Sequence, residues 1–177
     1  MLRRRMKRTG AFLLIIFIFS CRLPVKPGET APPPLVQENP EVKILREKIV
    51  EGAYHLLDTK NLNIRDKSFN TDCSGTVLAI YYYAGIDLSS EFGNFTGSGV
   101  ERIHALLVEY KLLHKDKIPK PGDIIFWDNT YDKNGDKKWN DELTHAGIVV
   151  EVGENGNIRY LHYNYSKGII VEEMNLF

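Results

Sequence analysis

Apolar side chains recur at helical spacing through the first half of the chain. From residue 42 to residue 57 they return every three or four positions, which predicts a helix. A second helix is expected from Cys73 to Ala84, because Asp72 is a favourable N-cap and Gly85 a favourable exit. A third is expected from about Ser98 to Leu113, and no element is predicted for the polar stretch 58–71.

Beyond Pro119 the pattern changes to short runs rich in Ile, Val and aromatic residues. These runs predict strands at Ile124–Trp127, Ala146–Val152, Ile158–Tyr163 and Gly168–Glu172, with a turn at residues 153–157 joining the second and third. Helices followed by antiparallel strands indicate an α+β fold, here one domain over residues 41–177.

The first forty residues follow a different pattern. A basic cluster precedes the apolar run 11–19, which predicts a signal peptide over residues 1–20 and is too short to span a membrane. The run ends Ile18-Phe19-Ser20-Cys21, which resembles a bacterial lipobox and predicts lipid on Cys21. The alternative is an ordinary signal peptide or a short apolar anchor in which Cys21 is incidental. Six prolines in residues 21–40 predict an extended tether.

The leader also changes the charge balance. It holds five of the 23 basic residues and no acid, so the remaining chain has 18 basic and 23 acidic residues, a net charge of −5. This argues against nucleic acid as a partner, since proteins that bind phosphates usually carry a clustered basic face. The expected location is outside the cytoplasm, in the cell envelope, anchored to a membrane by lipid.

Cys73 is the cysteine that remains if Cys21 carries lipid, because the chain has only these two. Such a thiol is either reactive or a buried apolar filler. In the first turn of a helix, unpaired backbone N–H groups and the positive end of the helix dipole favour a thiolate. We therefore expect the pKa of Cys73 to fall below its usual value of about 8.5. Ser74 and Gly75 are small enough to let a substrate backbone approach.

A cysteine nucleophile needs a base, and the chain has five histidines. His55, His104 and His114 fall in predicted helical segments without polar companions, so surface or packing roles are expected for them. His145 opens an apolar strand, where its ring could face a helix N-terminus packed against the sheet. His162, on the next strand, could polarise His145 as the third member of a triad, or be a half-buried strand histidine.

Three blocks of sequence carry a family resemblance. They are Asp72-Cys73-Ser74-Gly75 at a helix start, Pro121-Gly122-Asp123-Ile124-Ile125-Phe126 at the first strand, and Thr144-His145-Ala146-Gly147-Ile148-Val149 at the second. In this order they resemble the NlpC-type peptidoglycan cysteine peptidases and the related CHAP-type amidases. The resemblance implies a papain-like α+β fold, with N-terminal helices packed on a C-terminal antiparallel sheet.

The resemblance also implies roles for residues. Cys73 falls on the nucleophile and His145 on the general base, while the third position falls on the strand that holds His162. Asn164 shares the strand face of His162 and is the alternative third residue. The implied reaction cuts amide bonds in peptidoglycan peptides through a thioester, with no cofactor in the chemistry.

The implied partners are peptidoglycan and, through the anchor, a lipid membrane. Residues 65–71 depart from the Tyr-x-x-Gly-Gly-like segment that usually precedes the cysteine in NlpC-type enzymes, so the sequence does not identify the bond that is cut. The alternative function is a non-catalytic envelope lipoprotein that keeps the fold as a wall-binding or calcium-binding scaffold. The presence of both Cys73 and His145 disfavours it.

A loop between the first two predicted strands has the spacing of a calcium site. Oxygen ligands at alternate positions, continued by a backbone carbonyl, match an EF-hand-type loop: Asp132, Asn134, Asp136, Lys138 (backbone) and Asn140. Lys137 stands where a glycine is usual and Leu143 where a bidentate glutamate is usual, although Glu142 or Asp141 could substitute in a shifted loop. A polar hairpin tip with an Asn-Gly turn is the equal alternative. A calcium ion bound here would be structural.

Overall fold

The computed structural model describes residues 38–116 and 118–177. The predictions of a signal peptide, of lipid on Cys21 and of the tether up to residue 37 lie outside the described residues. In those two ranges, no helix is both long and apolar enough to cross a membrane.

Three α-helices form where the apolar spacing predicts them. They are α1 (Pro40–Leu56), α2 (Cys73–Tyr83) and α3 (Gly99–Glu109). The first begins with Pro40 at N1, and the side chain of Asn39 caps it by accepting a hydrogen bond from the N–H of Glu41. Helix α3 ends four residues before the expected Leu113. It stops there because Lys111 adopts a φ of 56° and the N–H of Leu112 donates to the carbonyl of Leu107.

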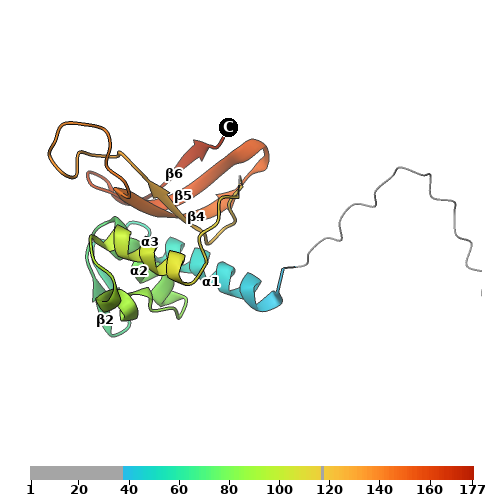
Figure 1. The fold of residues 1–177 in the computed structure, drawn as a ribbon. Helices are drawn as coiled ribbons and strands as arrows, with labels where there is room; N and C mark the ends of the chain where they lie inside the picture. The colour runs from blue at the N-terminus through green and yellow to red at the C-terminus, as the bar shows by residue number, and fades with distance from the viewer. Residues whose placement is uncertain (1–37, 117) are drawn as a thin grey trace, which may run out of the picture. The chain divides into compact units, whose positions relative to one another are not determined.

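The strands form a four-stranded antiparallel meander. In the order β3-β4-β5-β6 they are Ile124–Trp127, His145–Val152, Asn157–Asn164 and Gly168–Asn175. Figure 1 shows the helices below the sheet, with the loop 128–144 projecting at the upper left. The predicted α+β, papain-like fold with helices preceding the sheet is confirmed.

A hairpin and a 3₁₀ segment were not expected from the sequence. The stretch 58–71 contains a small hairpin of β1 (Leu62–Ile64) and β2 (Lys67–Phe69), and a 3₁₀ segment, η1, runs over Leu88–Asn94. The hairpin turns through Arg65, which has a φ of 54° although it is not glycine. A strand of three residues is too short to show alternation in the sequence, and the turn lacks the usual Asn or Gly signal.

Helix α2 is the centre of the core. Its residues Val77, Ala79 and Ile80 are fully buried, and they belong to the same cluster as Ile148 of β4 and Leu161 of β5. Helix α2 is apolar on nearly every side, as expected for a helix that is buried on nearly every side. The first turn of α2 is therefore held against the sheet, near the ends of the strands that carry the histidines.

Candidate active site

The turn before Cys73 is fixed by hydrogen bonds and by close packing. The side chain of Asp72 caps α2, because its Oδ1 accepts from the N–H of Gly75 at 2.7 Å and from the hydroxyl of Ser74 at 2.8 Å. Gly75 lies directly against the backbone of Asn70, leaving no room for a side chain. Cys73 thus begins the helix in a rigid position, as a free and partly buried cysteine.

The expected fall in the pKa of Cys73 is wrong. Burial raises the pKa of the thiol, and the charge of Asp72 raises it further. Backbone N–H groups, chiefly that of Ala146, lower the pKa but do not compensate. The position at a helix start was identified from the sequence, but the desolvation that opposes the helix dipole comes from packing. At neutral pH the resting cysteine is therefore a thiol.

His145 and His162 form a hydrogen-bonded pair. Nε2 of His145 lies 2.8 Å from Nδ1 of His162, and the two rings meet edge to face at 87°. His145 opens β4, and His162 is paired across the sheet with Gly147, two residues further along β4. This arrangement leaves Nδ1 of His145 as the ring nitrogen available to a thiol.

The electrostatics of the pair favour neutral rings. Burial lowers the pKa of His145 to about 4, and the neighbouring His162 adds to this effect. Burial also lowers the pKa of His162, which is only 7% exposed. Glu172 on β6 acts in the opposite direction on both rings. At neutral pH the site holds a neutral thiol and two neutral imidazoles.

The side chain of Asn164, the alternative third residue, forms hydrogen bonds in the β5–β6 turn and not with His145. Its Oδ1 accepts hydrogen bonds from the N–H and hydroxyl of Ser166 and from the N–H of Lys167, at 2.9 to 3.2 Å. These bonds close the turn between β5 and β6. The structure brings His162 to His145, and it uses Asn164 to close the hairpin.

These groups line one cavity of about 700 Å³. Its walls also contain several aromatic side chains: Trp127, Tyr131, Tyr160, Tyr163 and Tyr165. The ring of Trp127 lies 5.4 Å from that of His145 and 5.0 Å from that of Tyr160. Among the described residues, the lining contains one carboxylate, Asp72, and no lysine or arginine. The cavity is therefore an apolar, aromatic cleft that exposes a thiol and an imidazole.

Sequence reasoning missed Glu172 and the aromatic walls. Glu172 lies 3.2 Å from Nε2 of His162, an ion-pair distance. It is two residues along β6 from Ile170, the cross-strand partner of His162. Alternation along β6 could have placed it on the histidine face, but only if the register of β5 and β6 had been known.

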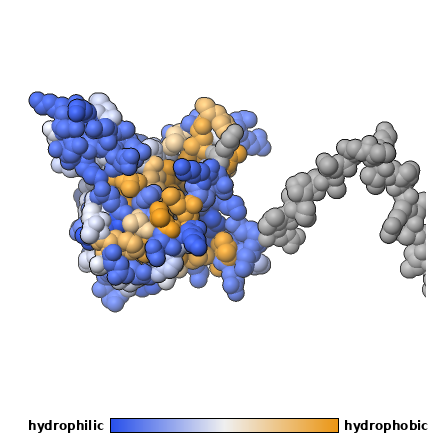
Figure 2. Space-filling view, in the orientation of Figure 1, coloured by the Kyte–Doolittle hydropathy of each residue, from blue (hydrophilic) through white to orange (hydrophobic). Residues whose placement is uncertain are grey.

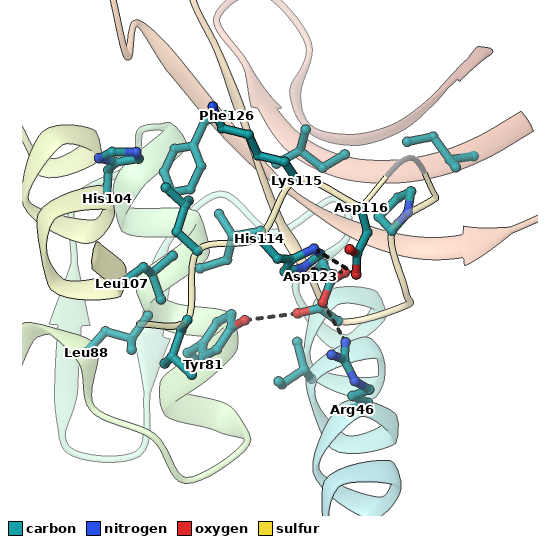
Figure 3. A pocket seen from close by; sticks show the side chains of 18 of the residues that line it. Arg46, Tyr81, Leu88, His104, Leu107, His114, Lys115, Asp116, Asp123 and Phe126 are labelled. Carbon is teal, nitrogen blue, oxygen red and sulfur yellow. Dashed lines mark hydrogen bonds and ion pairs between the residues drawn. The ribbon is translucent and has the colours of Figure 1, made fainter. Parts of the chain in front are cut away.

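The remaining histidines lie away from this cavity. Figure 3 shows a second cavity, of about 660 Å³, which contains His104 and His114. The ring of His104 packs edge-on against Phe126, as expected for a packing role. The prediction that His114 lies in a helix without polar companions is wrong. His114 follows α3, and its two ring nitrogens lie 3.3 Å from the carboxylate of Asp116 and 3.4 Å from that of Asp123.

His55 on α1 packs its ring against Tyr83 on α2, with the ring centroids 5.0 Å apart. This contact fits the expected packing role.

The loop 128–144 folds on its own hydrogen bonds. The carboxylate of Asp132 accepts from the N–H groups of Gly135 and Lys137, while Asn134 and Asp136 each accept from the N–H two residues on. Lys137, in the usual glycine place, has a φ of 64°. Figure 2 shows the loop as a hydrophilic projection. Within residues 38–116 and 118–177, no three His, Cys, Asp or Glu side chains gather as metal ligands. Calcium binding stays a prediction.

The fold and the cavity together define a class of protein. Helices that precede and pack on an antiparallel sheet are the arrangement of the papain-like α+β fold. In this chain, a cysteine at a helix start and a histidine pair on adjacent strands line one cavity of that fold. The model of the NlpC/P60 family matches residues 59–176, and the chain belongs to that family. This membership indicates a cell-wall peptidase that acts on peptidoglycan. No curated protein and no solved structure matches the chain.

Proposed function

We propose that this protein is an exported cysteine peptidase or amidase that hydrolyses amide bonds in peptidoglycan peptides. In this proposal Cys73 is the nucleophile, His145 the general base and His162 the residue that orients the base. One observation supports it above the others: Cys73 lines the same cavity as the bonded His145–His162 pair, in a chain of the NlpC/P60 family.

The first half of the reaction begins from neutral partners. Nδ1 of His145 takes the proton of the Cys73 thiol as the sulfur forms a bond to the substrate carbonyl carbon. The carbonyl oxygen gains negative charge, and the backbone N–H groups of Cys73 and Ser74 at the start of α2 can donate to it. Because the thiolate forms only as the sulfur attacks, the raised pKa of the resting thiol is compatible with catalysis.

The second half returns the proton and then releases the product. The imidazolium of His145 donates its proton to the leaving nitrogen, the C–N bond breaks, and a thioester remains on Cys73. Water then attacks the thioester carbonyl while His145 accepts a proton from it. When the C–S bond breaks, the thiolate recovers that proton and the acid product leaves. No cofactor takes part in these steps.

His162 contributes through its contact with His145. Its Nδ1 accepts the Nε2–H of His145, which leaves Nδ1 of His145 with a lone pair for the thiol proton. The same contact supports the imidazolium while it exists, as the orienting residue does in other catalytic triads.

Digestion of purified peptidoglycan tests the proposal. The wild type should release peptides with new termini, identified by mass spectrometry, and Cys73→Ala should release none while keeping its circular dichroism spectrum and Tm. His55→Ala is the matched histidine control, because His55 packs against Tyr83 outside the cavity. If Cys73→Ala released peptides at the wild-type level, the proposed mechanism would be wrong. Absence of release by the wild type, with binding to the wall intact, would support the scaffold function instead.

We also propose export and attachment to an envelope membrane through lipid on Cys21. The leader and the lipobox-like Ile18-Phe19-Ser20-Cys21 support this proposal. Cells that express the protein should place it in the detergent phase on phase separation, and Cys21→Ala should move it to the aqueous phase. A mature N-terminus at a residue other than Cys21 would contradict lipid attachment there.

A further inference from the structure

The β5–β6 pairing places a carboxylate beside the histidine pair. Tyr160 is opposite Glu172 and His162 is opposite Ile170, so Glu172 lies diagonal to His162 on the same face of the sheet. Nε2 of His162 is 3.2 Å from Oε2 of Glu172, and Nδ1 of the same ring is 2.8 Å from His145. Each ring nitrogen of His162 therefore faces a different partner.

The buried nitrogen of His162 has an incomplete contact. Within the described ranges, Nε2 of His162 has no aligned hydrogen bond, although Glu172 is at ion-pair distance. A buried N–H without an acceptor costs free energy, so a small rotation of the Glu172 carboxylate that aligns the two groups is favourable. Glu172 is 35% exposed at its side chain and has room for that rotation.

We propose that Glu172 is a positioning residue that fixes the proton positions of His162 and His145 across strands β4, β5 and β6. The inference rests on the proposed function, since it concerns the same base. An ionised carboxylate can only accept, so Nε2 of His162 must carry the proton. The neutral ring then has its lone pair on Nδ1, and His145 must donate from its own Nε2. As a result, Nδ1 of His145 is unprotonated and ready for the Cys73 thiol.

Without the carboxylate, the opposite arrangement becomes available. His162 could carry its proton on Nδ1 and donate to Nε2 of His145, which would place the His145 proton on Nδ1, toward the cavity. That form cannot take a proton from the thiol. One carboxylate outside the cavity lining thus selects between an active and an inactive arrangement of protons.

Other groups also face this carboxylate. The hydroxyl of Tyr160 on β5 donates to Oε2 at 3.5 Å, and Nζ of Lys167 in the β5–β6 turn lies 3.6 Å from Oε1. The titratable residues of the cavity include His145 from β4, His162 and Tyr163 from β5, Cys73 at the start of α2, and Asp72, which caps that helix. Glu172 acts to raise the pKa of both histidines, whereas Lys167 acts to lower that of His162.

The kinetic test compares Glu172→Gln with Glu173→Gln in the full-length protein. Glu173 is the next residue of β6 and its contact is Arg159, at 3.4 Å, so its variant is a matched control. In Glu172→Gln we expect kcat to fall about tenfold, the equivalent of about 1.4 kcal/mol, with KM little changed. The acid limb of kcat/KM should move to lower pH, because a charge that raises the pKa of His145 is lost.

Lys167→Gln tests the opposite change, because it removes a positive charge beside Glu172 instead of the negative charge of Glu172 itself. Without this cation, 3.6 Å from Oε1, the carboxylate of Glu172 acts on the histidine pair with no opposing charge from Lys167. Because Glu172 acts to raise the pKa of His145, the acid limb of kcat/KM should move to higher pH. Glu173→Gln should leave kcat and the acid limb unchanged. An unchanged kcat and acid limb in Glu172→Gln, or equal effects in the two glutamate variants, would overturn the inference.

Imidazole ¹⁵N spectra test the inference without turnover. In the wild type at neutral pH, His145 and His162 should both be protonated on Nε2, and Glu172→Gln should show a mixture with Nδ1-protonated rings. If Cys73→Ala kept its activity, the proposed function would fail while these spectra still decided the role of Glu172. Identical spectra in the wild type and Glu172→Gln would refute that role.

Discussion

Replacing His162 with Ala should slow catalysis strongly while leaving substrate binding almost intact. The change removes the acceptor that lies 2.8 Å from Nε2 of His145. This hydrogen bond matters most when His145 becomes an imidazolium. A hydrogen bond to a charged group contributes about 1.5–3 kcal/mol, so kcat should fall roughly 10- to 150-fold. The loss is smaller than that expected for Cys73→Ala, which removes the nucleophile itself.

The assay is steady-state cleavage of a defined peptidoglycan peptide, with Tm measured in parallel. His162 is buried, so the Ala variant should also lose stability, and kinetics are compared only well below its Tm. Asn164→Ala is the control from the same strand face. It loses the hydrogen bonds that close the β5–β6 turn, so its Tm should fall while kcat stays near the wild-type value. The opposite ranking of kcat would move the orienting role to Asn164.

Four further predictions follow from the geometry and charge of the site. Alkylation of Cys73 by iodoacetamide should show a pH midpoint above about 8.5, because burial and Asp72 raise the pKa of the thiol; rapid alkylation at about pH 6 would indicate a preformed thiolate. Gly147→Ala should cost about 1–3 kcal/mol of stability, because the added Cβ would lie 2.9 Å from a carbonyl oxygen of β5, and activity should fall with it. Gly93→Ala, with open space around it, should change neither. His145 has a folded pKa of about 4 against about 6.5 when unfolded, so its contribution to stability is present above about pH 6.5 and is lost as pH falls toward 4. Thermal melts of the wild type should therefore lose more Tm over that range than melts of His145→Gln. If the loop 128–144 binds calcium, EGTA should lower Tm in the wild type but not in Asp132→Ala, whereas equal melts with and without EGTA would favour the hairpin tip.

Much of the fold could be predicted because its signals are local. The cap at Asp72, the apolar run of α2 and the exit at Gly85 all lie within residues 72–85, and the structure has each where it was expected. Strands β3 to β6 likewise appear as dense runs of β-branched and aromatic residues. The antiparallel order of neighbouring strands indicated that His162 could contact His145, and the facing nitrogens of the two rings are 2.8 Å apart in the structure.

Features that depend on distant parts of the chain were missed. The pKa of Cys73 reflects burial at the contact of α2 with the sheet, a cost that position in a helix does not reveal. The companions of His114 include Asp123, and the role inferred for Glu172 depends on the register of β6. Each of these features needs packing or pairing that one local segment does not encode.

The central proposal is that Cys73 attacks the carbonyl carbon of a peptidoglycan amide bond. Rapid acid quenching during turnover, followed by intact-mass and peptide mapping, measures this step directly. The predicted result is an adduct with the mass of the acyl fragment, located on Cys73 and released by hydroxylamine as expected for a thioester. An adduct on another residue, or turnover by Cys73→Ala at the wild-type rate, would contradict the proposal.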